Sequence, residues 1–274
     1  MSDHQFLHQK NFYNDGYSST KMFDMGFPDL KITDYQFLEN KEILNIGGGN
    51  CADVWYLAKN NKIYAIDGSD YGVEEAKKHG IEAAVGDVSL SLHFQDKKFD
   101  IIILKDILEH IYNPIELLFE AKRVLKDSGY IILSLPNHFY FLFRLRILFG
   151  GNLIWKDLLH DHTKEFDEWN YQHVRFFTYK GLKKMLSTAG CSIEKAYWDF
   201  GTLAHYSDPD MYKTAFRMNR RQISSRRQWL MYKVFLPFYS FFNFIFPKSL
   251  RSLVVSLAPG LLCAGFYLKL VKSK

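Results

Sequence analysis

Ile43-Leu44-Asn45-Ile46-Gly47-Gly48-Gly49-Asn50-Cys51 is the stretch that decides the fold of this 274-residue chain. It is an apolar strand pattern that runs into consecutive glycines, and a second such strand ends about twenty residues later in Tyr64-Ala65-Ile66-Asp67. Glycines at a strand end let the backbone approach a ligand closely, and an acid at the next strand end can accept both hydrogen bonds of a ribose diol. Together the two stretches predict a nucleoside site.

Two further stretches extend this pattern. Ala84-Val85-Gly86-Asp87-Val88 is a short strand that ends in an acid, and residues 100–104 are expected to form a buried strand. Strands that alternate with helices predict a parallel, doubly wound sheet with its ligand at the carboxyl ends of the strands. The contiguous glycines do not match the G-x-G-x-x-G spacing of a dinucleotide fingerprint.

In order and spacing, residues 41–135 resemble the class I S-adenosylmethionine-dependent methyltransferases. The run Leu108-Glu109-His110 is similar to the small-molecule, type 11 branch, and Ser134-Leu135-Pro136-Asn137-His138-Phe139 is similar to its MetW-like proteins. The resemblance implies an α/β fold: a Rossmann-like, doubly wound, seven-stranded sheet that is mostly parallel, with helical inserts. It also implies a last antiparallel strand, here residues 265–271, between the two strands before it. The implied cofactor is S-adenosylmethionine.

The chain departs from the family pattern at two positions. Asn45 stands where the family usually has Asp or Glu, and Cys51 stands where it usually has a third glycine. Loss of one charge contact to the cofactor's ammonium group predicts binding that is weaker by about 1 kcal/mol. The same departures also favour a second hypothesis, a non-catalytic partner or regulatory subunit with a methyltransferase fold.

The expected elements divide the chain into six stretches. They are an N-terminal arm closing over the cofactor (1–40), a cofactor-binding core (41–135), a substrate-cap insert (136–178), a core helix and strand (179–204), a basic aromatic helical insert (205–262) and a final core strand (263–274). Helices are expected at residues 52–59, 72–79, 114–125 and 179–189.

Composition points to a cytoplasmic protein. At 47% hydrophobic residues, the chain is long enough for one well-packed α/β domain with additions. Three widely separated cysteines favour a reducing compartment and no bound metal, and the N-terminus lacks the pattern of an export signal. His160-Asp161-His162 has a spacing that suits a metal on a strand, but it has no third ligand signal.

Charge is distributed unevenly along the chain. From residue 211 to the end there are twelve Lys and Arg and no Asp or Glu, so the net charge of +5 is the difference between a +12 tail and a −7 remainder. The tail is also aromatic, which is typical of a helix at a membrane interface. Residues 213–251 are therefore a candidate for peripheral contact with the inner membrane face, and helices packed on the sheet are the alternative.

The resemblance assigns the cofactor and acceptor contacts. The expected cofactor-binding residues are Asn45, Gly47, Gly49, Asp67, Gly68, Asp87, Val88, Lys105, Tyr13 and Tyr17, and the expected substrate-binding residues are Arg144, Arg146 and Arg175. Arginine forks suit phosphate and carboxylate groups, although a solvated surface is the alternative for Arg144 and Arg146.

An acceptor hydroxyl or ammonium has to lose a proton during methyl transfer, so a general base is expected. Histidine suits that role near neutral pH. The candidates are His173, His138, Asp106 and His110, and a purely structural hydrogen bond is the alternative for each histidine.

The function expected from these residues is methyl transfer to an O or N atom of a polar small molecule. Phosphorylated, nucleotide-linked and lipid-linked precursors of surface polysaccharide or capsule are the acceptors considered, by analogy with methyltransferases that carry such tails. A nucleic-acid methyltransferase is disfavoured, because no Asn-Pro-Pro-Tyr-like motif follows the fourth strand and the tail is too apolar for a phosphate track.

Overall fold

The computed structural model of the chain describes residues 10, 14, 38–89, 91–148, 173–197, 248–263 and 265–273. The chain divides into two compact units. The sheet unit comprises Met1–Pro136, Gln172–Tyr197 and Gly265–Lys274, and the second unit comprises Asn137–Tyr171 and Trp198–Ala264.

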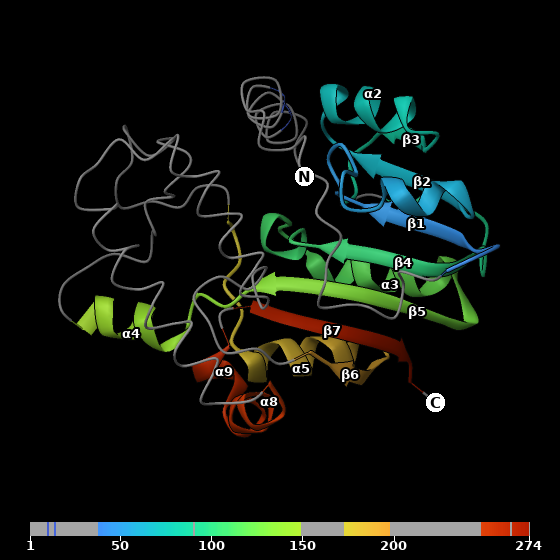
Figure 1. Ribbon diagram of the computed structural model, residues 1–274. Helices are drawn as coiled ribbons and strands as arrows, with labels where there is room; N and C mark the ends of the chain where they lie inside the picture. The colour runs from blue at the N-terminus through green and yellow to red at the C-terminus, as the bar shows by residue number, and fades with distance from the viewer. Residues whose placement is uncertain are drawn as a thin grey trace. The chain divides into compact units, whose positions relative to one another are not determined.

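The sheet unit is built on one seven-stranded sheet (Figure 1). Its strands are β1 (Glu42–Ile46), β2 (Lys62–Asp67), β3 (Glu82–Val85), β4 (Phe99–Lys105), β5 (Leu125–Pro136), β6 (Cys191–Ala196) and β7 (Gly265–Lys272). They lie in the order β3-β2-β1-β4-β5-β7-β6. β7 is antiparallel to both of its neighbours, and the other pairs are parallel. This arrangement confirms the predicted fold class, including the place of the last strand.

The core runs along the two central strands. Ile43, Leu44 and Ile46 of β1 are fully buried, and so are Ile102 and Leu104 of β4. A parallel strand that is covered on both faces reads as a continuous apolar run, because no residue in it faces water. β1 and β4 pair in parallel, so both strands end at the same edge of the sheet.

Helices begin where the sequence supplies a cap. The hydroxyl of Ser69 accepts a hydrogen bond from Gly72 N at the start of α2 (Asp70–Lys78), and Thr178 does the same for Gly181 N in α5 (Tyr179–Thr188). Pro114 opens α3 (Pro114–Val124), at a position where its missing N–H is not needed.

The helix expected at residues 52–59 is replaced by a short 3₁₀ helix, η3 (Trp55–Lys59). Its backbone bonds span three residues: Val54 N donates to Cys51 O, Leu57 N to Val54 O and Asn60 N to Leu57 O. The chain enters this segment through a tight turn, with Cys51 at a φ of 59°. The segment therefore continues with i→i+3 bonds from that turn to the start of β2.

The second unit is described in three helices, α4 (Phe141–Leu148), α8 (Lys248–Leu257) and α9 (Pro259–Leu262). The buried amide of Asn137 donates to Gly260 O at 3.1 Å and to Cys263 O at 2.6 Å, which ties two distant parts of this unit together. Most of the expected basic aromatic insert (205–262) lies outside the described residues. Among the residues that are described, none of the helices is both apolar enough and long enough to span a bilayer.

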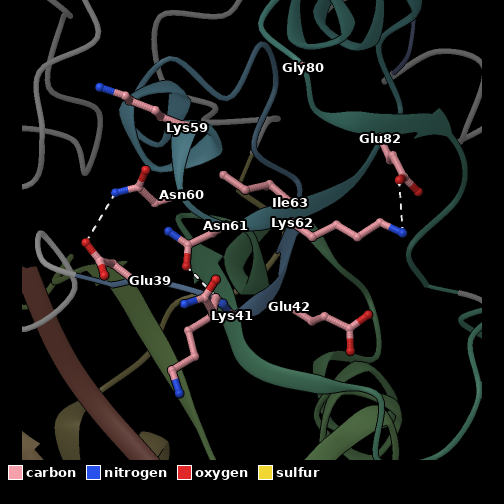
Figure 2. A pocket seen from close by; sticks show the side chains of 11 residues that line it. Glu39, Lys41, Glu42, Lys59, Asn60, Asn61, Lys62, Ile63, Gly80 and Glu82 are labelled. Atoms are coloured by element: carbon pink, nitrogen blue, oxygen red, sulfur yellow. Dashed lines mark hydrogen bonds and ion pairs between the residues drawn. The ribbon is translucent and has the colours of Figure 1, made fainter.

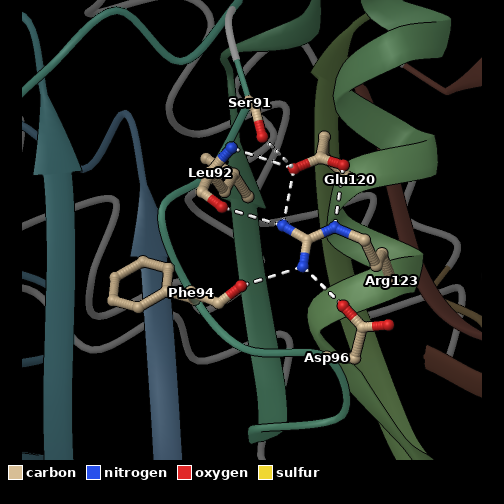
Figure 3. Close-up of polar contacts among 6 residues, drawn as sticks. All are labelled: Ser91, Leu92, Phe94, Asp96, Glu120 and Arg123. Atoms are coloured by element: carbon tan, nitrogen blue, oxygen red, sulfur yellow. Dashed lines mark hydrogen bonds and ion pairs between the residues drawn. The ribbon is translucent and has the colours of Figure 1, made fainter.

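Arg123 on α3 anchors the segment that leads into β4 (Figure 3). Its guanidinium donates to Phe94 O and Leu92 O, each at 2.8 Å, and forms ion pairs with Glu120 at 2.8 Å and Asp96 at 2.7 Å. One side chain therefore satisfies two backbone carbonyls and two carboxylates. The bond to Arg123 lowers the pKa of the Glu120 carboxyl to about 2.

We expect Arg123→Ala to reduce the free energy of unfolding by about 2 kcal/mol at pH 7, because several charge-assisted hydrogen bonds are lost together. The folded pKa of Glu120 lies below its ordinary value of 4.5, so the pair stabilises the fold above that value and loses its effect as the pH falls toward about 2. Urea unfolding at pH 7 and along that acid window measures both effects. Lys184→Ala, an exposed change of equal charge on α5, is the control; equal midpoints for the two variants at pH 7 contradict the assignment.

Candidate functional site

A left-handed glycine turn follows β1 at the carboxyl edge of the sheet. Gly47 has a φ of 68° and Gly49 a φ of 55°, a region that favours glycine. Gly47 N donates to Ile66 O of β2 at 2.8 Å. A Cβ atom at Gly47 would lie 2.4 Å from Cδ1 of Ile107, which follows β4. The turn is therefore fixed between the ends of β2 and β4, the two strands that flank β1.

Asp67, the last residue of β2, holds this turn in place. The residue is 7% exposed, and its Oδ2 accepts from Gly49 N at 2.7 Å while its Oδ1 accepts from Ser69 N at 2.8 Å. Burial raises the pKa of this carboxyl, and the backbone N–H groups of Ser69, Gly49 and Gly68 oppose that rise. A carboxylate offers about four acceptor positions. Both oxygens thus keep capacity for a further donor, which fits a ribose diol.

The N-terminal arm touches the same region through its two described residues. Lys10 forms an ion pair with Asp70 at 2.8 Å, and Asn14 Oδ1 accepts from the Ser69 hydroxyl at 2.7 Å. Ser69 and Asp70 directly follow the strand end that carries Asp67. These contacts tie Lys10 and Asn14 to the start of α2, and closure of the arm over the cofactor stays a prediction.

Asp87 and Val88 follow β3, next to the end of β2. Gly86 N donates to Asp67 O at 2.9 Å, which places the two loops side by side. Asp87 Oδ1 accepts from Ser89 N at 2.9 Å and from the Ser89 hydroxyl at 2.6 Å, and Val88 is 9% exposed. An ordered carboxylate beside an apolar side chain is a suitable surface for a base that follows a ribose.

The two positions that depart from the family pattern contact each other. Asn45 is 1% exposed, and its Nδ2 lies 3.5 Å from Cys51 Sγ. Burial raises the pKa of the Cys51 thiol, with the charges of Asp53 and Asp67 adding to the rise. An amide and a neutral thiol therefore pack together beneath the glycine turn, where the family has an acid and a glycine.

The end of β4 carries two ionisable groups. Lys105 forms an ion pair with Asp53 at 2.6 Å, and both side chains are largely buried. Asp106 has a φ of 49°, and its carboxylate accepts from the Ser134 hydroxyl of β5 at 3.2 Å. Sequence reasoning missed Asp53, although an acid four residues after the last glycine of the turn was the available signal.

Glu109, His110 and His173 form a cluster just beyond β4. Glu109 and His110 lie in the short helix η4 (Leu108–His110), and the rings of His110 and His173 meet edge to face with centroids 4.7 Å apart. One ligand atom from each of the three residues lies within 4.8 Å of the others. Burial, and then the charge of Asp106, raise the pKa of Glu109 well above its ordinary value.

The side chain of Arg175 is bound to the backbone of the protein itself. Its guanidinium donates to Tyr112 O, with Nε at 2.9 Å, and its backbone N donates to Glu109 O at 3.0 Å. The side chain therefore fastens the segment before α5 to the loop after β4. A role in substrate binding stays a prediction for this residue.

Two further expected residues, His138 and Arg144, lie in the second unit. His138 is 5% exposed in the second unit, where Arg144 Nε also donates to Phe139 O at 2.6 Å. The side chains of three expected contact residues, Tyr13, Tyr17 and Arg146, lie outside the described part of the structure. The His-Asp-His run at residues 160–162 lies outside it too.

A polar groove of about 760 Å³ lies at the opposite edge of the sheet, where β1 and β2 begin (Figure 2). Its charged groups are partly paired with one another, as in the Lys62–Glu82 ion pair at 3.2 Å and the Asn60–Glu39 hydrogen bond at 3.4 Å. Ligands of open α/β sheets bind at the carboxyl ends of strands. The groove is therefore separate from the site built around Asp67.

Comparison with known proteins agrees with this geometry. Residues 44–133 match the type 11 family model described as a methyltransferase domain. A ubiquinone biosynthesis O-methyltransferase of Haemophilus ducreyi is 26% identical over 147 residues, which are 48% of this chain and 59% of that protein. The chain spans between 30% and 60% of the length of the curated relatives that it matches.

Solved structures show the same fold at low identity. An S-adenosylmethionine-dependent methyltransferase of Methanosarcina mazei has a TM-score of 0.55 at 19% identity, covering 90% of this chain and 99% of that one. Another, described as a possible histamine N-methyltransferase of Thermotoga maritima, has a TM-score of 0.50 at 22% identity, covering 68% of this chain and 81% of that one.

Alanine substitutions at Gly47 and Gly80, which both have positive φ, separate the cost of a steric clash from the cost of backbone strain. We expect Gly47→Ala to lower the free energy of unfolding by about 3 kcal/mol, because φ strain and a clash with Ile107 add together. Gly80→Ala has a similar φ of 78° but meets nothing within 4 Å, and we expect it to cost about 1 kcal/mol. Urea denaturation of both variants measures the difference, and equal losses would show that the contact with Ile107 is not restrictive.

Proposed function

Because residues 44–133 are a type 11 domain of the S-adenosylmethionine-dependent methyltransferases, we propose that the whole chain transfers a methyl group to a polar small molecule. The observation that carries the proposal is the buried Asp67 carboxylate, which orders the glycine turn and keeps acceptor capacity for a ribose diol. The name of one relative, an O-methyltransferase, favours an oxygen atom as the acceptor over a nitrogen atom.

The cofactor supplies a methyl group on a positively charged sulfur. A lone pair of the acceptor attacks the methyl carbon, and the sulfur leaves with the electrons of the C–S bond. The chain's part is to bind, orient and exclude water. Gly47 and Gly49 would give the amino acid part of the cofactor access to the backbone, and Asp67 would accept hydrogen bonds from the ribose. Asp87 and Val88 would hold the base. Lys105 lies at the end of β4, where its ammonium group is paired with Asp53. It would also donate to the carboxylate of the cofactor.

The acceptor must lose a proton in the same reaction. His173 and His110 lie together in the sheet unit, beyond the end of β4, and Asp106 lies at that strand end. These three groups are the proposed candidates for the base, and His138 is a fourth from the second unit.

The acceptor class follows from the charge of the chain. A tail with twelve cations and many aromatic residues suits an anionic or lipid-linked acceptor at a membrane surface. Precursors of surface polysaccharide fit that description and remain the acceptors that we propose to test first.

We expect Asp67→Ala to weaken binding of S-adenosylmethionine by about 5- to 150-fold, because two charge-assisted hydrogen bonds to the ribose are worth about 1–3 kcal/mol. Calorimetric titration with S-adenosylmethionine and S-adenosylhomocysteine measures the affinity. Asp127→Ala removes an exposed carboxylate elsewhere in the sheet unit and should bind as the parent does. Asp67→Asn, which preserves the shape of the side chain, separates lost contacts from a lost fold, and parental affinity in both Asp67 variants would remove this residue from the site.

A second candidate function, a non-catalytic partner of a biosynthetic enzyme, is favoured by the Asn45–Cys51 contact. The double variant Asn45→Asp/Cys51→Gly restores the family pattern, and we expect it to bind the cofactor about fivefold more tightly through the ammonium group, an effect of about 1 kcal/mol. Measurable binding by the parent chain supports the enzyme. Binding that appears only in the double variant supports the partner.

A further inference from the structure

The cluster of Glu109, His110 and His173 is the one group of metal-ligating side chains of its kind in the described part of the chain. All three residues belong to the sheet unit. Two come from η4, directly beyond β4, and the third precedes α5 by several residues. The sequence predicted no metal, because these residues are too far apart in the chain to show a ligand spacing.

Main-chain bonds hold the two halves of the cluster together. Val174 N and Arg175 N both donate to Glu109 O, at 2.8 and 3.0 Å, and the Arg175 guanidinium donates to Tyr112 O. His173 is therefore fastened beside the Glu109–His110 pair by the residues that follow it. Sites that bind metals tightly depend on such support from outside the ligand set.

The surroundings of the Glu109 carboxylate are a second, independent indication of a bound cation. Its side chain belongs to a residue that is only 1% exposed, and within the described residues neither carboxylate oxygen has a hydrogen-bond partner. A buried carboxylate keeps its charge only where it is paired, hydrogen-bonded or bound to a metal. A cation between Glu109 and the two histidines would give this carboxylate a positively charged partner and offset the nearby charge of Asp106.

We propose that Glu109, His110 and His173 bind one divalent transition-metal ion. Two imidazoles and one carboxylate are the ligand set of catalytic zinc sites and of other open transition-metal sites, and imidazole nitrogen disfavours Mg²⁺. Ligand atoms around a tetrahedral zinc ion lie about 3.4 Å apart. The present spacing of up to 4.8 Å needs only small side-chain rotations to reach that value.

Three protein ligands leave a coordination position open for water or for an acceptor oxygen. This role rests on the proposed methyl transfer. An acceptor hydroxyl on the ion releases its proton to solvent, and the resulting oxyanion attacks the methyl carbon while the electrons of the broken C–S bond stay on sulfur. The acceptor class is then a hydroxyl compound, and the two histidines act as ligands and not as bases.

Calorimetric titration of the untagged full chain, after treatment with a chelator, tests the site. ZnCl₂ and MnCl₂ are the probes and MgCl₂ is the comparison. We expect one equivalent of Zn²⁺ with a micromolar or lower Kd, at least tenfold weaker in His173→Ala and in Glu109→Gln. His93→Ala, which removes an exposed histidine outside the cluster, should bind as the parent does.

The outcomes separate this proposal from the proposed function. Absence of saturable Zn²⁺ binding, or equal Kd values for the parent, His173→Ala and Glu109→Gln, overturns the metal site. Glu109→Gln keeps the volume of the side chain, and a native circular dichroism spectrum shows that its loss of binding is not a loss of fold. Titration of the same samples with S-adenosylmethionine reads the cofactor site separately, so a chain that binds Zn²⁺ but no cofactor contradicts the proposed function alone.

Discussion

The rest of the site depends on one buried carboxylate that is bound by backbone N–H groups. Asp67 accepts from Gly49 on one side and from Ser69 on the other, so a single side chain joins the turn after β1 to the start of α2. The cost of burying its charge is offset by those donors. Loops at the carboxyl ends of strands are otherwise independent of one another, and this contact makes two of them behave as one surface.

The sheet could be predicted because each strand shows its own pattern in a short stretch of sequence. Mainly apolar runs mark β1 and β4, and the resemblance placed β7 between β5 and β6, as the structure has it. The limits of prediction lie where contacts join distant residues. Nothing in the spacing of residues 52–59 shows that this segment forms a 3₁₀ helix, and nothing near Asn45 shows that its amide faces a thiol. The partnership of Glu109 with His173 depends on hydrogen bonds across more than 60 residues of chain, which no local pattern reports.

The end of β4 concentrates the ionisable groups of the sheet unit. Lys105, Asp106 and Glu109 follow one another within five residues, and each meets a partner or a cluster from another part of the chain. This distribution contrasts with the polar groove at the other edge, where several of the charged groups pair with each other (Figure 2). Ionisable groups brought together by several different elements distinguish the edge where chemistry is expected.

The position of β7 has a consequence for biosynthesis. β5 pairs with β7 from Pro136 opposite Gly265, so its free edge waits for a partner that is made about 130 residues later. At ribosomal rates of about 5–20 residues per second, that edge stays unpaired for on the order of ten seconds. An exposed edge is a template for pairing with other chains. The nascent protein therefore passes through an interval of vulnerability to aggregation that ends only when β7 closes the sheet.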